Sequence, residues 1–217
     1  MSALPPHAGQ PVLHRGHAIA GARAAVVMVH GRGASAQSIL TLVDAIEQPG
    51  IAYVAPQAQG GTWYPLGFMS PTERNEPGIT SGISVVHALV DDLVAQGIPD
   101  ERIVLLGFSQ GACLAGTALQ RRPRRHGGLL MFSGGLIGPP GTEWSAAPGL
   151  DGTPVFLGCS DVDAHIPEPR VRESAAHFER MGARVTCRIY PGMGHQVNED
   201  EIAFANDLLA GVADVAG

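Results

Sequence analysis

The chain has little charge, few aromatic residues and few cysteines, and each shortage excludes a class of protein. Of its 217 residues, 16% are charged and 5% aromatic, whereas 45% are hydrophobic. A chain of this composition is not expected to be disordered or fibrous. The net charge of −6, with no basic stripe, predicts no nucleic-acid partner. The length predicts a single domain over residues 1–217, in which residues 1–23 form an N-terminal segment.

The three cysteines, Cys113, Cys159 and Cys187, show no metal-ligand spacing and lie in apolar stretches. Such thiols predict reduced, buried side chains and a cytoplasmic location. The start of the chain has neither the basic nor the apolar part of a secretory signal. No apolar run reaches the roughly 20 residues that span a bilayer, so no stable membrane insertion is expected.

The histidines near the start, His7, His14 and His17, are too loosely spaced for a metal site. They are expected to lie in a solvated segment. No other cluster has the geometry that a metal requires. The sequence therefore predicts neither a metal nor a cofactor.

Apolar runs alternate with segments of helical period along the chain. The runs are hydrophobic on both faces, as parallel strands between two helical layers must be. This alternation predicts an α/β fold, a three-layer α/β/α sandwich with a mostly parallel central sheet. The expected strands are Val12–Ile19 at an edge, Ala24–Val29, Ile51–Ala55, Ile103–Phe108, Leu129–Phe132, Val155–Leu157 and Val185–Tyr190, and the main helices are Ser35–Ile46, Ile83–Ala95, Ala112–Gln120, Arg170–Met181 and Glu199–Val212.

A Gly-x-Ser-x-Gly motif joins an expected strand to an expected helix. Ser109 stands between Gly107 and Gly111, directly after the buried run that begins at Ile103. A sharp, strained turn there exposes the serine hydroxyl and tolerates only small residues two positions before and after it. Because a hydroxyl is a poor nucleophile at neutral pH, this interpretation requires a base and an oriented acid elsewhere in the chain.

Both partners follow Ser109 in the order that this kind of sheet predicts. Active groups gather at the carboxyl ends of parallel strands. The strand that begins at Val155 ends in two carboxylates, Asp161 and Asp163, and the next strand leads to His195. His195 is expected to take the serine proton, and one carboxylate to orient the imidazole. The other carboxylate is expected to cap the following turn, and the pattern alone leaves the choice open.

An acyl-transfer site also needs donors for the oxyanion. One expected donor is the backbone N–H of Gln110, directly after the nucleophile, and the other is the backbone N–H of Arg32 in the loop after Ala24–Val29. The neighbouring Gly31 lets the backbone approach a substrate. The side chain of Gln110 is expected to face solvent.

Four motifs in this order resemble the phospholipase/carboxylesterase family of α/β-hydrolases, which includes bacterial carboxylesterases and acyl-protein thioesterases. They are His-Gly-x-Gly from His30, Gly-Phe-Ser-Gln-Gly around Ser109, Asp-x-x-Ile-Pro from Asp163 and Gly-x-Gly-His ending at His195. The resemblance implies the α/β-hydrolase fold and a serine hydrolase that cleaves carboxylic esters, thioesters or lysophospholipids through an acyl-enzyme on Ser109. It also implies a small-molecule ester substrate, no cofactor and a homodimer.

The resemblance favours Asp163 as the acid, because the family's acid is followed by x-x-Val/Ile-Pro. Asp161 instead has the spacing from Gly158 that the family's acid often shows, since the loop is two residues longer here. The substrate-binding residues expected around the nucleophile are His30, Gly31, Trp63, Tyr64, Phe68 and His165. His30 is expected to order the oxyanion loop through hydrogen bonds.

Two alternatives stay open at this level. One is another activity on the same scaffold, namely a dienelactone-type hydrolase, a peptidase or an acyltransferase. The other is a binding module that kept the fold without catalysis. A substrate panel separates the first group, and a fluorophosphonate probe tests the second.

Overall fold

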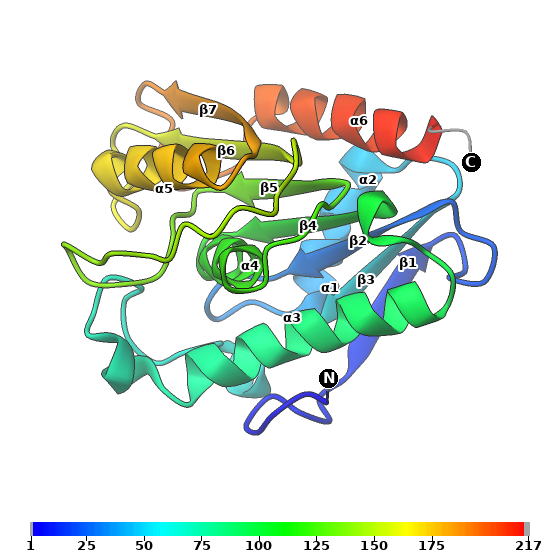
Figure 1. Ribbon diagram of the computed structural model, residues 1–217, viewed down its shortest axis with the longest axis horizontal. Helices are drawn as coiled ribbons and strands as arrows, with labels where there is room; N and C mark the ends of the chain where they lie inside the picture. Colours follow the sequence, from blue (N-terminus) through cyan, green and yellow to red (C-terminus); the bar gives the residue numbers. More distant parts are fainter. Residues whose placement is uncertain (1, 215–217) are drawn as a thin grey trace.

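One seven-stranded sheet organises the chain (Figure 1). The computed structural model describes residues 2–214. The strands lie in the order β1-β3-β2-β4-β5-β6-β7; only the β1–β3 pair is antiparallel. Their bounds are β1 Val12–Gly16, β2 Ala24–Val29, β3 Ile51–Pro56, β4 Ile103–Phe108, β5 Gly128–Phe132, β6 Pro154–Ser160 and β7 Arg184–Tyr190.

Helices cover both faces of this sheet. Their bounds are α1 Ala36–Ile39, α2 Val43–Ile46, α3 Gly78–Ala95, α4 Gln110–Arg121, α5 Glu168–Arg180 and α6 Glu199–Asp214. One hydrophobic cluster joins the sheet to α3, α4 and α5, and a second joins it to α1, α2 and α6. The six residues of β2 are all buried because each face has its own helical layer. The predicted α/β/α sandwich is therefore confirmed.

The segment expected as one helix over 35–46 is divided into α1, a 3₁₀ turn and α2. Ser35 caps its start, since the Ser35 hydroxyl accepts the N–H of Ser38 and the Ser38 hydroxyl accepts the N–H of Ser35. The expected strand over 12–19 is shorter and ends at Gly16, where φ is +74°. A β-carbon on Gly16 would lie 2.6 Å from the carbonyl oxygen of Ile51.

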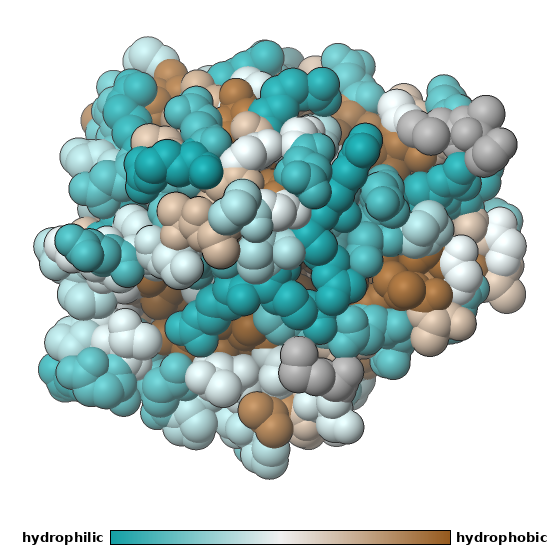
Figure 2. Space-filling model, viewed as in Figure 1, coloured by the Kyte–Doolittle hydropathy of each residue, from teal (hydrophilic) through white to brown (hydrophobic). Residues whose placement is uncertain are grey.

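Helix α3 is the one described helix that is long and apolar enough to cross a membrane by length and composition, with a mean hydropathy of 1.3. In this fold its apolar side packs on the sheet and on α4. A β-carbon on Gly82 would lie 2.9 Å from the Leu114 side chain, so the two helices approach closely. Figure 2 shows mostly hydrophilic side chains over the face along which α3 runs in Figure 1. Packing in the core therefore accounts for the hydropathy of α3.

The expectation of a solvated N-terminal segment is wrong for His7. Its side chain is buried; Nε2 donates to the carbonyl of Trp63, and Nδ1 accepts the N–H of Gln59. These bonds tie the start of the chain to the irregular segment after β3. They leave no pattern in the sequence because the partners lie about 50 residues away.

Candidate active site

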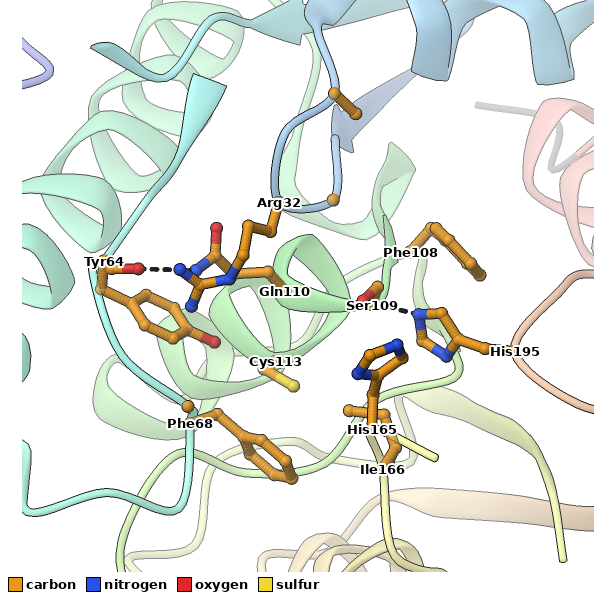
Figure 3. Close-up of a pocket in the computed structure, with 13 residues that line it drawn as sticks. Arg32, Tyr64, Phe68, Phe108, Ser109, Gln110, Cys113, His165, Ile166 and His195 are labelled. Carbon is orange, nitrogen blue, oxygen red and sulfur yellow. Dashed lines mark hydrogen bonds between the residues drawn. The ribbon is translucent and has the colours of Figure 1, made fainter. Parts of the chain in front are cut away.

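Ser109 sits at the turn between β4 and α4 in a strained backbone conformation, with φ 56° and ψ −122° (Figure 3). The glycines two residues before and after it are required, because a β-carbon at either position would overlap backbone atoms. A β-carbon on Gly107 would lie 2.5 Å from the backbone nitrogen of Ala112, and one on Gly111 would lie 2.6 Å from the carbonyl oxygen of His30. The motif therefore forms because only glycine fits on both sides of the serine, and the turn presents the hydroxyl at the carboxyl edge of the sheet.

A continuous hydrogen-bonded chain joins Ser109 to an imidazole and a carboxylate. Oγ of Ser109 lies 2.8 Å from Nε2 of His195, and Nδ1 of His195 lies 2.7 Å from Oδ2 of Asp163. The carboxylate accepts from Nδ1–H, which leaves Nε2 free to accept the serine proton. Three segments far apart in the sequence thus converge in the geometry that serine activation requires.

The Asp163 side chain is fully buried, whereas that of His195 is 21% exposed. Burial by itself would raise the pKa of Asp163. Hydrogen bonds from His195 and from the N–H groups of His165 and Ile166 outweigh it and hold that pKa below its ordinary value. Those two N–H groups reach Oδ1 at 2.8 and 3.0 Å, so both carboxylate oxygens are engaged. The carboxylate is therefore ionised and fixed in orientation at neutral pH.

Asp161 serves the loop that follows β7. Its Oδ1 accepts the N–H of Gly192 at 2.8 Å, and the neighbouring Ser160 hydroxyl accepts the N–H of Gly194 at 3.0 Å. Both bonds hold the turn that carries His195. Of the two carboxylates, Asp163, which the family resemblance favoured, faces the imidazole, and Asp161 caps the turn.

The loop after β2 lies against Ser109. Nδ1–H of His30 donates to the carbonyl of Gly31, and Nε2 accepts the N–H of Ala58, which fixes one neutral tautomer. Burial lowers the pKa of His30 and agrees with this neutral form. A β-carbon on Gly31 would lie 3.5 Å from Cβ of Ser109, so this backbone is close to the Ser109 side chain.

Two backbone donors remain free beside Ser109. Within residues 2–214, the N–H groups of Arg32 and Gln110 have no hydrogen-bond acceptor. Gln110 begins α4, where the first N–H groups have no partner inside the helix and favour negative charge. Both N–H groups are thus free to donate to a bound molecule, and both residues line the same cleft as Ser109.

The Gln110 side chain differs from its predicted position. Instead of facing solvent it is buried; its Oε1 accepts the N–H of Trp63 at 2.9 Å, and its Nε2 donates to the carbonyl of Tyr64 at 2.8 Å (Figure 3). The Gln110 side chain therefore fixes the segment after β3. Arg32 also holds this segment, because its guanidinium donates to the carbonyls of Pro65 and Leu66.

Ser109 opens into a cleft of about 340 Å³. Its walls include eight residues that the sequence predicted: Gly31, Arg32, Tyr64, Phe68, Ser109, Gln110, His165 and His195. Five further lining residues were not predicted: Ala34, Gly67, Phe108, Cys113 and Ile166. Cys113 could have been predicted as a lining residue from the sequence, because it follows Ser109 by four residues, about one helical turn, and so lies on the same side of α4.

Two residues expected to bind substrate do not line this cleft. Trp63 is fully buried behind it and donates Nε1–H to the carbonyl of His30, and His30 is itself fully buried. Both residues support the walls of the cleft. His165 lies at the rim instead, where its ring contacts that of His195 edge-on with centroids 4.8 Å apart.

No group of three His, Cys, Asp or Glu side chains in residues 2–214 has the arrangement of a metal site. The groups joined to Ser109 are an imidazole and a carboxylate, and two residues with free backbone N–H groups line the same cleft. This set suits acyl transfer without a metal ligand in the walls.

A mostly parallel sheet with a serine on the strand–helix turn defines the α/β-hydrolase class, as predicted. Within that class, the chain belongs to the phospholipase/carboxylesterase family, whose model matches residues 17–212. The family predicted from the four motifs is therefore confirmed.

Solved structures and curated sequences agree with this assignment. A phospholipase/carboxylesterase from Dyadobacter fermentans is 37% identical and has a TM-score of 0.89, with 96% of this chain and 100% of that chain covered. Esterase PE8 is 26% identical with a TM-score of 0.74, over 94% of this chain and 98% of its own. Acyl-protein thioesterase 1 of Eremothecium gossypii is 37% identical over 139 residues, which are 58% of this chain. The aligned part spans about half the length of two curated relatives, 56% in the Eremothecium protein and 52% in one from Oryza sativa subsp. japonica.

Proposed function

We propose that this protein is a serine hydrolase that cleaves carboxylic esters, including thioesters, through an acyl-enzyme on Ser109. The observation that carries the proposal is the hydrogen-bonded chain from Ser109 Oγ through His195 to Asp163, with contacts of 2.8 and 2.7 Å. The names of the relatives, carboxylesterase and acyl-protein thioesterase, support the same chemistry.

In the proposed reaction His195 acts first as a base. Nε2 takes the proton of Ser109 as Oγ attacks the ester carbonyl, and Asp163 stabilises the imidazolium that forms. His195 then gives that proton to the leaving oxygen or sulfur. In the second half, His195 activates a water molecule, which attacks the acyl-serine and frees the acid.

The backbone N–H groups of Arg32 and Gln110 bind the oxyanion in both tetrahedral intermediates. They are held in place before the substrate arrives, so they stabilise the developing charge without reorganisation. Removing one such donor typically costs about 3 kcal/mol of barrier height. Because these donors belong to the backbone, side-chain substitutions at either position leave them present.

A small-molecule ester fits a cleft of about 340 Å³ better than a long acyl chain does. Lysophospholipids are therefore the less favoured members of the proposed substrate class. The proposal includes a cytoplasmic location without stable membrane insertion, which the free cysteines Cys113, Cys159 and Cys187 support. It also includes a homodimer, which rests on the family resemblance, and sedimentation of the purified protein tests it.

The decisive experiment compares Ser109→Ala with Ser133→Ala. Ser133 directly follows the neighbouring strand β5, is a second serine with a strained backbone (φ +49°), and is fully buried. Ser109→Ala should abolish both fluorophosphonate labelling and hydrolysis of p-nitrophenyl butyrate, whereas Ser133→Ala should keep the labelling. Turnover that survives the loss of Ser109 would refute the proposal.

A further inference from the structure

The wall of the cleft contains a buried hydroxyl without a partner. The Tyr64 side chain is 2% exposed and lines the cleft, and its OH has no hydrogen-bond partner among the described residues. Figure 3 shows this OH pointing toward Cys113, on the side of the cleft that also holds Phe68. Buried polar groups in proteins are almost always hydrogen-bonded, so an orphan hydroxyl in a ligand site calls for an explanation.

The Cys113 thiol does not satisfy the hydroxyl. The Cys113 side chain lies close enough to affect the ionisation of Tyr64, in part through a contact of the thiol with the hydroxyl. A thiol is only a weak acceptor, and this contact lacks the geometry of a full hydrogen bond, so the hydroxyl has no oxygen or nitrogen partner. Sγ of Cys113 instead receives the N–H of Gly135 at 3.5 Å. Burial above all, and the thiol next, raise the pKa of Tyr64 well above its usual value, against a smaller opposing effect of Arg32. The phenol therefore stays protonated and offers an O–H donor.

This hydroxyl lies on the acyl side of the reaction. His195 must protonate the leaving group, so the leaving group lies beside His195, His165 and Phe108. The acyl chain is then directed to the opposite side of Ser109, where Tyr64, Cys113 and Phe68 form the wall. Apart from the phenol, the thiol and the polar atoms of Gln110, this wall offers an acyl chain mainly apolar contacts.

The charged groups near the Tyr64 hydroxyl favour an acyl group that carries a neutral oxygen over one that carries a carboxylate. The guanidinium of Arg32 lies over the Tyr64 ring at 5.9 Å, and that of Arg170 lies behind Phe68 at 5.8 Å. Both cations already donate to backbone carbonyls, Arg32 to residues 65 and 66 and Arg170 to residues 136, 138 and 139. A carboxylate buried at the hydroxyl would lack the paired donors that a buried anion needs.

We propose that the Tyr64 hydroxyl selects esters whose acyl group carries a neutral hydrogen-bond acceptor, a ketone, ether or hydroxyl oxygen, a few atoms from the scissile carbonyl. This inference rests on the proposed function of the same cleft and names the class of acyl group within it. The acceptor supplies the partner that Tyr64 lacks, whereas an alkyl chain of the same shape leaves the buried donor unsatisfied.

The test uses pairs of p-nitrophenyl esters that match in shape and differ in one oxygen. Methoxyacetate is paired with butanoate, and 4-oxopentanoate with 4-methylpentanoate. The ratio of kcat/KM within each pair is measured for the wild type and for Tyr64→Phe. Comparing the ratio between the two enzymes cancels the intrinsic reactivity of each ester, and it also cancels any difference in the amount of folded protein.

Tyr64→Phe should lower the oxygen-to-alkyl ratio by about tenfold for at least one pair, as expected for a lost hydrogen bond to a buried donor. Tyr64→Leu is a second variant with the same expected direction. The matched control is Tyr53→Phe, which removes a buried phenol that already donates to the carbonyl of Ile46, and it should leave both ratios unchanged.

The outcomes separate the two levels of the proposal. An enzyme that hydrolyses the esters, but whose ratios are the same in wild type and Tyr64→Phe for both pairs, overturns the inference about the acyl group alone. A wild type that hydrolyses none of the esters and takes no fluorophosphonate on Ser109 overturns the proposed function and the inference with it.

Discussion

Gly111 packs directly against Val29, so closely that a β-carbon on Gly111 would overlap the carbonyl of Val29. The start of α4 is thereby pressed against the end of β2, which leads into the loop with the expected oxyanion donor Arg32. Contact between backbones, without side chains between them, brings that loop to the nucleophile. The second glycine of the motif therefore has a packing role as well as a conformational one.

Gly111→Ala should destabilise the fold by more than about 3 kcal/mol, because the methyl group meets backbone atoms that cannot move aside independently. Gly211→Ala is the matched control, since Gly211 lies within α6 and a β-carbon there meets nothing within 4 Å. That change should stabilise the protein by about 0.5–1 kcal/mol. Urea unfolding of both variants measures the contrast. Equal effects of the two substitutions would contradict the packing argument.

The two carboxylates at the end of β6 give a second contrast. Asp163→Asn should lower kcat about ten-thousandfold, as the equivalent change does in a serine protease, because the amide favours the wrong imidazole tautomer. Asp161→Asn keeps an oxygen for the N–H of Gly192 and should cost less than about tenfold. Hydrolysis of p-nitrophenyl butyrate by both variants ranks them. The reverse ranking would transfer the role of the acid to Asp161.

The sequence predicted those parts of the site whose chemistry constrains residue types at fixed spacing. The motif around Ser109, the expected base His195 and the fold class follow from strand ends, glycines and hydrophobic runs. The strand pattern alone left the choice between Asp161 and Asp163 open, because both follow the same strand, and only the family resemblance favoured Asp163. In the structure the loop turns Asp163 toward the imidazole.

Interactions between distant segments were missed because they leave no local pattern. The Gln110 side chain bonds backbone groups of Trp63 and Tyr64, more than 40 residues away. A glutamine at that position is equally compatible with solvent exposure. Trp63 was placed in the pocket for a similar reason, since an aromatic side chain in an irregular segment can line a cavity or support it from behind.

Glu201 predicts a pH dependence of stability. It is fully buried in the first turn of α6; burial, above all, raises its pKa to about 7, against the opposing N–H of Asn198. In the unfolded chain a glutamate titrates near about 4.3. Between about pH 4 and 7 the unfolded chain therefore loses this proton while the folded protein keeps it, so stability falls as the pH rises. Above about pH 7 the stability stays lower by the full free-energy cost of the buried, ionised Glu201 carboxylate.

Glu201→Gln should remove this cost while keeping an oxygen for the N–H of Asn198. The variant should be more stable than wild type by about 1–3 kcal/mol at pH 8, and the difference should shrink toward zero near about pH 4.5. Glu199→Gln, in the same helical turn but exposed, controls for loss of a charge there. Urea unfolding at the two pH values measures the effect. A difference that does not vary with pH would argue against a protonated carboxyl in the fold.

The Gln110 side chain gives the last prediction. Gln110→Ala leaves the backbone N–H that we assign to the oxyanion, but it strips partners from the buried N–H of Trp63 and carbonyl of Tyr64. Stability should fall by about 2–4 kcal/mol, since each orphaned buried group costs about 1–3 kcal/mol. Because the Tyr64 wall loosens while the oxyanion donor stays, KM should rise more than kcat falls.

The matched control on the same helix is Gln120→Ala. Gln120 is also buried, and its Nε2 donates to the carbonyl of Ser145 at 2.9 Å, at the end of α4 opposite the nucleophile. Its loss should cost about 1 kcal/mol of stability and leave KM and kcat as in wild type. If Gln110→Ala behaves like this control in both assays, the Gln110 amide does not hold the segment after β3. If kcat collapses while KM is unchanged, the side chain acts on the transition state itself.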